Sequence, residues 1–329
     1  MRNYLSSAQN IAVFRALQLG DILCSIPAIR ALRNAKPNAN ITFIGMEHTK
    51  DIIGRFAKYI DDFIVFPGYL GLPEQPYDDE KFGDFCAEVT AKKFDLLLQM
   101  QGNGNIVNPM LRSLKIGRLV GFCRFAHEED ECLLIYPKTP HEILRHLHLM
   151  RHLGIENGDT ELEFEITEHD EKDFEKLRFP YLDGAYLAIH PGSRGDWRQW
   201  PPLYFAAIAD HCINHGFSVV LTGTPSEKAI TDQVASMMQQ PCINLCGRTN
   251  LGTLAVLLRK SHGLISNCTG VSHLAAALKK PSVVISMDGE PHRWAPLNQE
   301  LHHTIDWCTT PDYRLVLSAV DKLINNKLS

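Results

Sequence analysis

The chain has 329 residues, 45% of them hydrophobic and 22% charged, which is typical of a globular protein with two domains of ordinary size. With 33 Lys and Arg against 38 Asp and Glu, the net charge is −5, so no nucleic-acid partner is expected. No apolar run is long enough to span a membrane, and no signal peptide is recognised at the N-terminus. Nine scattered cysteines without such a signal indicate a reducing, cytoplasmic location.

The first half of the chain alternates between strand-like and helix-like segments. Strands are predicted at residues 11–17, 41–45, 62–66, 93–100 and 118–122. Helices are predicted at 22–34, 51–59 and 141–154, and the Pro-, Gly- and charge-rich stretch 67–84 is predicted to be a loop. An acidic stretch without periodicity, 155–183, is interpreted as a linker or the beginning of a second domain.

The second half repeats the alternation almost without interruption. Strands are predicted at 185–193, 217–223, 243–247, 262–267 and 281–287, and helices at 201–216, 225–238, 251–261, 270–280 and 312–326. The alternation predicts an α/β fold with buried parallel sheets. We expect two Rossmann-like domains, 1–168 and 169–329, facing a central cleft, and the last helix could pack back on the first domain.

Residues 262–281, HGLISNCTGVSHLAAALKKP, have the pattern of a strand, a small polar turn and a helix. Free N–H groups and the helix dipole make such a helix start a binding site for an anion. A second unit of this kind lies upstream at 187–206. Together the two units predict a site for a ligand with two phosphates.

Five segments resemble a known family: LGDILCSIPAIRALRNAKPNANITFIG at 19–45, IHPGSRGDWRQWPP at 189–202, VVLTGTPSE at 219–227, NLCGRTNLGTLAVLL at 244–258 and SNCTGVSHLAAAL at 266–278. The chain is similar to the ADP-heptose:lipopolysaccharide heptosyltransferases, glycosyltransferase family 9. The resemblance implies a GT-B fold and an inverting transfer of heptose from an ADP-linked donor, without cofactor or metal. It also implies a saccharide or lipid-linked saccharide acceptor bound by the first domain, and peripheral contact with the inner membrane.

The resemblance also implies two catalytic residues. Asp21 matches the carboxylate proposed in the family to deprotonate the acceptor hydroxyl; as a residue at a helix start it is equally suited to be an N-cap. Arg198 lies where the family has a Lys that meets the diphosphate, and a cation there would stabilise the leaving group. A solvated Arg is the alternative.

The remaining expected site residues bind the donor. The resemblance assigns phosphate contacts to Gly192, Ser193, Thr269 and Gly270, and a contact with the donor phosphate or sugar to His273. Glu227 would bind the ribose, or only favour a helix start through its charge, and Thr249 would border the nucleobase.

One position departs from the family pattern. Family members have an Asp, thought to bind donor-sugar hydroxyls, where this chain has Cys268, and a thiol accepts such hydrogen bonds poorly. Either the donor sugar differs, or another residue takes this role, or the activity is weak; a nucleophilic Cys268 at a helix start is a further reading. Two other functions therefore stay open: an enzyme of the same fold with another donor or an epimerase activity, and a non-catalytic nucleotide-binding protein.

Overall fold

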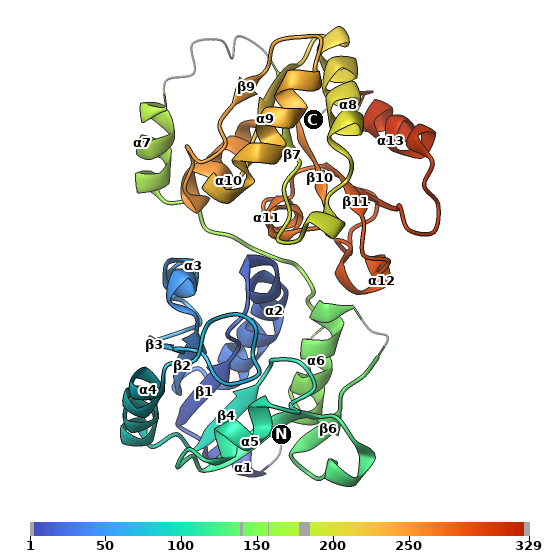
Figure 1. Cartoon of the computed structure of the whole chain (residues 1–329). Coiled ribbons are helices and arrows are strands. Elements are labelled where there is room, and N and C mark those ends of the chain that lie inside the picture. Colours follow the sequence, from blue (N-terminus) through green and yellow to red (C-terminus); the bar gives the residue numbers. More distant parts are fainter. Residues whose placement is uncertain (1–2, 139–140, 157, 178–184, 326–329) are drawn as a thin grey trace. The chain divides into compact units, whose positions relative to one another are not determined.

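The computed structural model describes residues 3–138, 141–156, 158–177 and 185–325. The chain divides into two compact units, Met1–Glu161 and Leu162–Ser329 (Figure 1). Each unit contains one parallel six-stranded sheet with helices on both faces.

The sheet of the first unit has the strand order β3-β2-β1-β4-β5-β6. Its strands are β1 (Asn10–Phe14), β2 (Asn40–Gly45), β3 (Asp62–Val65), β4 (Leu96–Gln99), β5 (Arg118–Cys123) and β6 (Leu133–Ile135). In β1 every residue after Asn10 is buried, which explains its uninterrupted apolar sequence. Alternate residues serve the two faces, so Ala12 and Phe14 belong to one core cluster.

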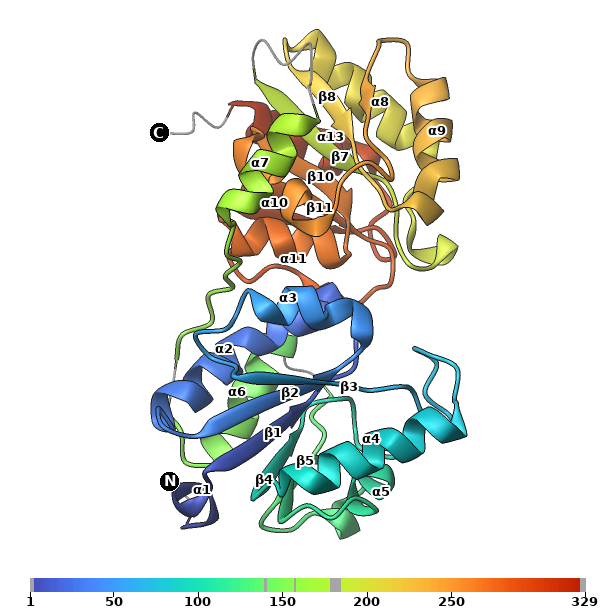
Figure 2. The same cartoon turned by 90° about the vertical axis from the view of Figure 1, so that its left-hand side faces the viewer.

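The helices of the first unit are α1 (Asn3–Ser7), α2 (Leu19–Ala35), α3 (Lys50–Gly54), α4 (Asp79–Lys92), α5 (Val107–Arg112) and α6 (Glu142–His152). In Figure 2, α2 and α6 lie side by side on one face of the sheet, and α4 and α5 cover the other. Phe85 and Val89 of α4 enter the same core cluster as Phe14. The cluster therefore fills the space between the sheet and α4.

The second sheet has the order β12-β11-β10-β7-β8-β9. Its strands are β7 (Tyr186–His190), β8 (Ser218–Leu221), β9 (Ile243–Asn244), β10 (Gly263–Asn267), β11 (Ser282–Ser286) and β12 (His302–Asp306). Counted along the chain within each unit, both sheets follow the order 3-2-1-4-5-6 of the Rossmann fold.

The helices of the second unit are α7 (Glu168–Lys176), α8 (Pro202–Asn214), α9 (Lys228–Met237), α10 (Leu251–Lys260), α11 (Gly270–Ala277), α12 (Pro291–Trp294) and α13 (Tyr313–Asn325). The last helix, α13, packs on β11, β12 and α8 of its own unit. Val316, Val320 and Leu323 anchor it in the same core cluster as Trp200.

The structure corrects two predicted coil segments. The expected loop 67–84 ends earlier, because α4 begins at Asp79 with Asp78 as an N-cap whose carboxylate accepts a hydrogen bond from Lys81 N at 3.2 Å. The expected linker 155–183 contains α7, capped by Thr167; residues 157 and 178–184 of that stretch lie outside the described residues. Both helices are strongly polar, so their sequences resemble loops.

The strand order of each sheet reverses at one point, between β1 and β4 in the first unit and between β7 and β10 in the second. The loops that follow these strands leave the sheet in opposite directions, and ligands of open parallel sheets bind at such points. Predicted site residues follow three of these four strands: β1, which ends at residue 14, β7, which ends at residue 190, and β10, which ends at residue 267. Within the described residues, no helix is both long and apolar enough to cross a membrane.

Candidate functional site

Asp21 lies at the reversal point of the first sheet, in the first turn of α2. Gln18, not Asp21, is the N-cap residue, which corrects the capping interpretation. Asp21 nevertheless helps to close the helix start, because its Oδ2 accepts a hydrogen bond from Gln18 N at 3.3 Å. The side chain of Asp21 retains 22% exposure, so solvent and ligands can reach it.

A fully buried arginine, Arg15, binds both the main chain and the carboxylate of Asp21. Its Nε donates to the main-chain oxygen of Asp21 at 2.7 Å, and its Nη2 lies 3.3 Å from Asp21 Oδ1. The same Nη2 lies 3.1 Å from Glu142 Oε1 at the start of α6. Since a buried guanidinium needs compensation, these bonds fix the position of Asp21 relative to the sheet.

Glu142 is the centre of a buried charge cluster that sequence reasoning missed. Arg145 pairs with its Oε2, and His146 Nε2 lies 3.4 Å from its Oε1. Burial alone would raise the pKa of Glu142, but the bond to His146 and the charges of Arg15 and Arg145 together hold it well below its usual range. Burial and the nearby Arg15 lower the pKa of His146 to about 4. The sequence signal for this cluster was the presence of Glu142 and Arg145 among apolar residues of the predicted helix 141–154.

At the reversal point of the second sheet, one buried amide joins the two loops. Asn267, the last residue of β10, donates through Nδ2 to the main-chain oxygens of Pro191 at 2.7 Å and Gly192 at 3.2 Å. Its Oδ1 accepts from Trp200 N at 2.8 Å. Both ends of the loop after β7 are therefore fixed to the strand that leads into α11.

Arg198 lies in this loop, on the short 3-10 helix Asp196–Arg198, and its guanidinium pairs with Asp288. Asp288 follows β11 and also accepts from Ser286 Oγ at 2.9 Å and from Glu290 N at 3.2 Å. Burial opposes its charge, but these bonds and Arg198 keep the pKa of Asp288 below its usual range. The Nε of Arg198 is buried and has no hydrogen-bond partner among the described residues.

Asp288 is the second residue that sequence reasoning missed, although it follows the predicted strand 281–287 directly. It lies close enough to Cys268 for its charge to influence that thiol: burial and then Asp288 raise the pKa of Cys268 to about 12. Cys268 is 5% exposed and its Sγ lies 3.9 Å from the main-chain oxygen of Trp294. A buried, protonated thiol is a poor nucleophile, so the surroundings of Cys268 argue against the nucleophile interpretation.

Glu227 ends the 3-10 helix Pro225–Glu227 and lies against Gly192. Its Oε2 accepts from Thr224 N at 2.7 Å and lies 3.7 Å from Nε2 of the buried His190. A Cβ on Gly192 would overlap the Glu227 carboxyl group, which explains why a glycine occupies this position. The structure thus brings the loops after β7 and β8 together around this carboxylate.

The other predicted donor residues lie around the start of α11 and before α10. Thr269 is the N-cap residue of α11, Gly270 is its first residue and His273 is 3% exposed in its second turn. Ser193 is almost buried in the loop after β7, and Thr249 is half-buried just before α10. Apart from Asp21, which belongs to the first unit, all predicted site residues therefore lie in loops or helix starts of the second unit.

A cavity of about 640 Å³ lies elsewhere in the second unit, lined by residues of α12, β12 and α13. It includes His292, His303 and Lys322 but none of the predicted donor residues. The predicted donor residues lie in the loops and helix starts after β7, β8, β9 and β10, so this cavity is separate from the candidate donor site.

Two Rossmann-type sheets in two successive units are the architecture of the GT-B fold, and this defines the structural class of the protein. The chain belongs to glycosyltransferase family 9 (heptosyltransferase), whose model matches residues 84–312. The family resemblance predicted from the five sequence segments is therefore confirmed.

Individual relatives are similar at low identity. Lipooligosaccharide heptosyltransferase 2 of Haemophilus ducreyi is 28% identical over 168 residues, 42% of this chain and 48% of that protein. The match thus spans about half the length of that relative. A lipopolysaccharide core heptosyltransferase of Haemophilus influenzae is 20% identical over 90% of this chain and 84% of its own length.

Solved structures match over nearly the whole chain. A glycosyl transferase of family 9 from Veillonella parvula has a TM-score of 0.79 at 19% identity, covering 97% of this chain and 98% of that one. ADP-heptose LPS heptosyltransferase II of E. coli has a TM-score of 0.75 at 18% identity, covering 96% and 98%. These similarities confirm the predicted α/β class and GT-B fold.

Proposed function

We propose that this protein transfers a heptose from an ADP-linked donor to a saccharide acceptor of the lipopolysaccharide core. Its family and the names of its relatives support the sugar and the acceptor. An E. coli heptosyltransferase with 16% identity and a TM-score of 0.72 has been solved with ADP, which supports the nucleotide. If the acceptor is lipid-linked, the enzyme works in peripheral contact with the inner membrane.

The observation that carries the proposal is the arrangement around Asn267. This one side chain fixes Gly192 on one loop and precedes the helix start at Thr269 and Gly270 on the other. Free N–H groups at that helix start favour the diphosphate. Arg198, with its buried and unbonded Nε, adds a cation, and Glu227 accepts from the ribose hydroxyls.

The reaction that we infer is a single displacement with inversion. Asp21 takes the proton of the acceptor hydroxyl while the oxygen of that hydroxyl forms a bond to the anomeric carbon of the heptose. The bond between that carbon and the phosphate oxygen breaks, and ADP leaves with the electron pair. Arg198 and the start of α11 stabilise the negative charge that develops on the leaving diphosphate.

The first test is the choice of nucleotide. Purified protein is melted with ADP, UDP, GDP, CDP and ADP-heptose, because a ligand that binds the folded state raises the Tm by mass action. Selective stabilisation by ADP and ADP-heptose is the expected result, followed by ADP release on addition of core-oligosaccharide acceptors. A preference for another nucleotide would replace the proposed donor, and stabilisation without turnover on any acceptor would favour a non-catalytic binder.

We propose further that Asp288 replaces the sugar-binding carboxylate that the family has at position 268. The family resemblance puts an Asp where this chain has Cys268, and the charge of Asp288 acts on that thiol from the next loop. Asp288 is ionised at neutral pH, because its pKa is lowered. Beyond its bonds to Arg198, Ser286 and Glu290, its carboxylate can accept one further bond, from a sugar hydroxyl. The carboxylate would thus come from β11 instead of β10.

The variant Asp288→Asn separates this role from mere positioning of Arg198. If Asp288 binds the sugar, the variant loses at least about tenfold in affinity for ADP-heptose and little for ADP, since a hydrogen bond to a charged group contributes about 1.5–3 kcal/mol. Equal losses for both ligands in calorimetric titrations would mean that Asp288 only positions Arg198. Glu290→Gln, in the same loop, serves as the matched control.

A further inference from the structure

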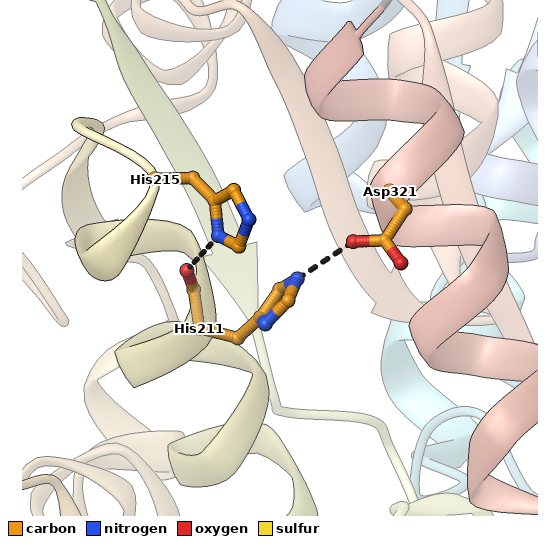
Figure 3. Close-up of side chains that lie close together, drawn as sticks. All are labelled: His211, His215 and Asp321. Atoms are coloured by element: carbon orange, nitrogen blue, oxygen red, sulfur yellow. Dashed lines mark hydrogen bonds and ion pairs between the residues drawn. The ribbon is translucent and has the colours of Figure 1, made fainter.

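A group of potential metal ligands lies on the second unit, among residues that the donor site does not use. His211 belongs to the last turn of α8, His215 follows the end of that helix, and Asp321 lies on α13 (Figure 3). One potential ligand atom of each residue lies within 4.8 Å of those of the other two. The three side chains therefore converge from two helices on one point.

Hydrogen bonds orient the two imidazoles. His215 Nδ1 lies 2.8 Å from the main-chain oxygen of His211, and since a carbonyl only accepts, this nitrogen carries the proton. The neutral ring then has its lone pair on Nε2, the atom that would bind a metal. His211 Nε2 lies 2.7 Å from Asp321 Oδ1, so a nitrogen and a carboxylate oxygen already meet.

The group is accessible to ions from solvent. The side chains of His211 and Asp321 are 25% and 47% exposed, and His215 is exposed. The four-residue spacing puts both histidines on one side of the helix end, with ring centroids 4.3 Å apart. A direct His211–Asp321 bond explains two of the three residues but gives no role to the anchored ring of His215.

We propose that His211, His215 and Asp321 bind one divalent transition-metal ion of the Zn²⁺ class, with water as the fourth ligand. Two imidazole nitrogens and one carboxylate oxygen suit Zn²⁺, which accepts ligands at about 2.0–2.2 Å in a tetrahedron with one open position. The His211–Asp321 bond would open slightly to admit the ion. Bound metal would connect α8 to α13 and so fasten the last helix of the chain.

The test uses the full chain without a histidine tag, and ZnCl₂ in competition with a chromophoric chelator. One equivalent of Zn²⁺ is expected to bind, and His215→Gln and Asp321→Asn are each expected to weaken binding by at least about tenfold, as even loss of an outer-shell partner commonly does. His215→Gln is informative because the residue is exposed and the His211–Asp321 bond survives. Zinc should raise the Tm of the unmodified chain more than that of this variant.

The matched control is His148→Gln. His148 and His152 have the same spacing on α6, but no third ligand joins them among the described residues. Cysteine binding is separated by Co²⁺ substitution, since Cys308 is exposed: the proposal expects a spectrum without thiolate charge-transfer bands. Absence of one-equivalent binding, thiolate bands, or equal affinity in the unmodified chain and both ligand variants would each overturn it.

Discussion

Asp21 closes the start of α2 and is also the residue that we propose as the catalytic base. It accepts from Gln18 N at the start of α2, and it is held by the buried Arg15. The ion pair fixes the direction of the carboxylate, which matters for the base that we propose to deprotonate the acceptor. Its partial exposure leaves the carboxylate open to that acceptor.

Asp21→Asn is expected to lower kcat by about 10²–10⁴-fold, because the amide cannot take the acceptor proton. ADP affinity should stay within about twofold, since the nucleotide binds elsewhere in our proposal. Initial rates of ADP release and calorimetry measure both quantities. Asp51→Asn, a change of the same kind in the first turn of α3, should leave both unchanged. A kcat above one tenth of the original would remove Asp21 from the role of base.

Gly192→Ala tests the contact between the loops after β7 and β8. The added methyl group would overlap the carboxyl group of Glu227, so that carboxylate must leave the position in which we propose that it binds the ribose. We expect the Kd for ADP to rise by about tenfold, equivalent to about 1.4 kcal/mol. Gly83→Ala, in α4, adds a methyl group that meets nothing within 4 Å, and should leave the Kd unchanged while stabilising the helix. Unchanged ADP binding in Gly192→Ala would exclude Glu227 from the nucleotide site.

At the scale of elements, the second sheet positions its loops through side-chain to main-chain bonds. The main-chain pairing of β10 ends at Asn267. From there the side chain of Asn267 bonds to the main chain at both ends of the loop after β7. Trp200, fully buried at the end of that loop, packs edge-to-face against Phe205 and Trp307 and parallel to Tyr313 in the core cluster. The loop is therefore held at both a polar and an apolar point.

Asn267→Ala should lower the free energy of unfolding by about 2–4 kcal/mol, because it leaves buried main-chain groups of Pro191 and Trp200 without partners. ADP affinity should fall as well, since the loop loses its attachment. Urea unfolding and calorimetry measure the two effects. Asn298→Ala is the matched control and should cost less than about 1 kcal/mol, because this exposed amide accepts from Glu300 N and Leu301 N in its own loop. A loss of stability at full affinity would show that the attachment serves folding alone.

At the scale of the whole molecule, each unit contains a buried histidine whose pKa is lowered to about 4. Burial and Arg15 lower the pKa of His146 to about 4, in contact with Glu142 and near Arg145. Burial and the neighbouring His303 lower the pKa of His302 to about 4, and its Nδ1 lies 2.8 Å from Ser282 Oγ. In the unfolded chain both histidines would titrate near 6.5.

Stability should therefore fall as the pH is lowered from 7 towards 4, because the unfolded chain binds protons that the folded chain refuses. Between pH 7.5 and pH 5 the loss is about 2 kcal/mol for each histidine. Denaturant unfolding at the two pH values should show this difference. It should shrink in His302→Asn for the second unit, whereas the exposed His292→Asn should leave it unchanged. Equal pH dependence in His302→Asn and the unmodified chain would contradict the buried, neutral state.

Much of the architecture was predictable because apolar runs report burial directly. The strand at 41–45 was predicted almost to the residue, since a strand covered on both faces of a parallel sheet is apolar throughout. The strand at 62–66 was predicted as closely, although β3 lies at the edge of the sheet and buries only Ile64. The helices α4 and α7 were not, because their outward faces are charged and each buries only a narrow stripe. The edge strand β12, HHTID, was missed for the same reason.

The sequence by itself determined the alternation of strands and helices, the family, and the residues of the short motifs around Asp21, Arg198 and Thr269. These features are local, since they depend on spacing and on neighbours along the chain. Only the tertiary structure decided that Arg15, itself paired with Glu142, holds Asp21, and that Asp288 pairs with Arg198. Such contacts join residues far apart in the chain. Parallel strands bring them together through long crossover connections, and the neighbours of a residue along the chain do not specify the order or register of those strands.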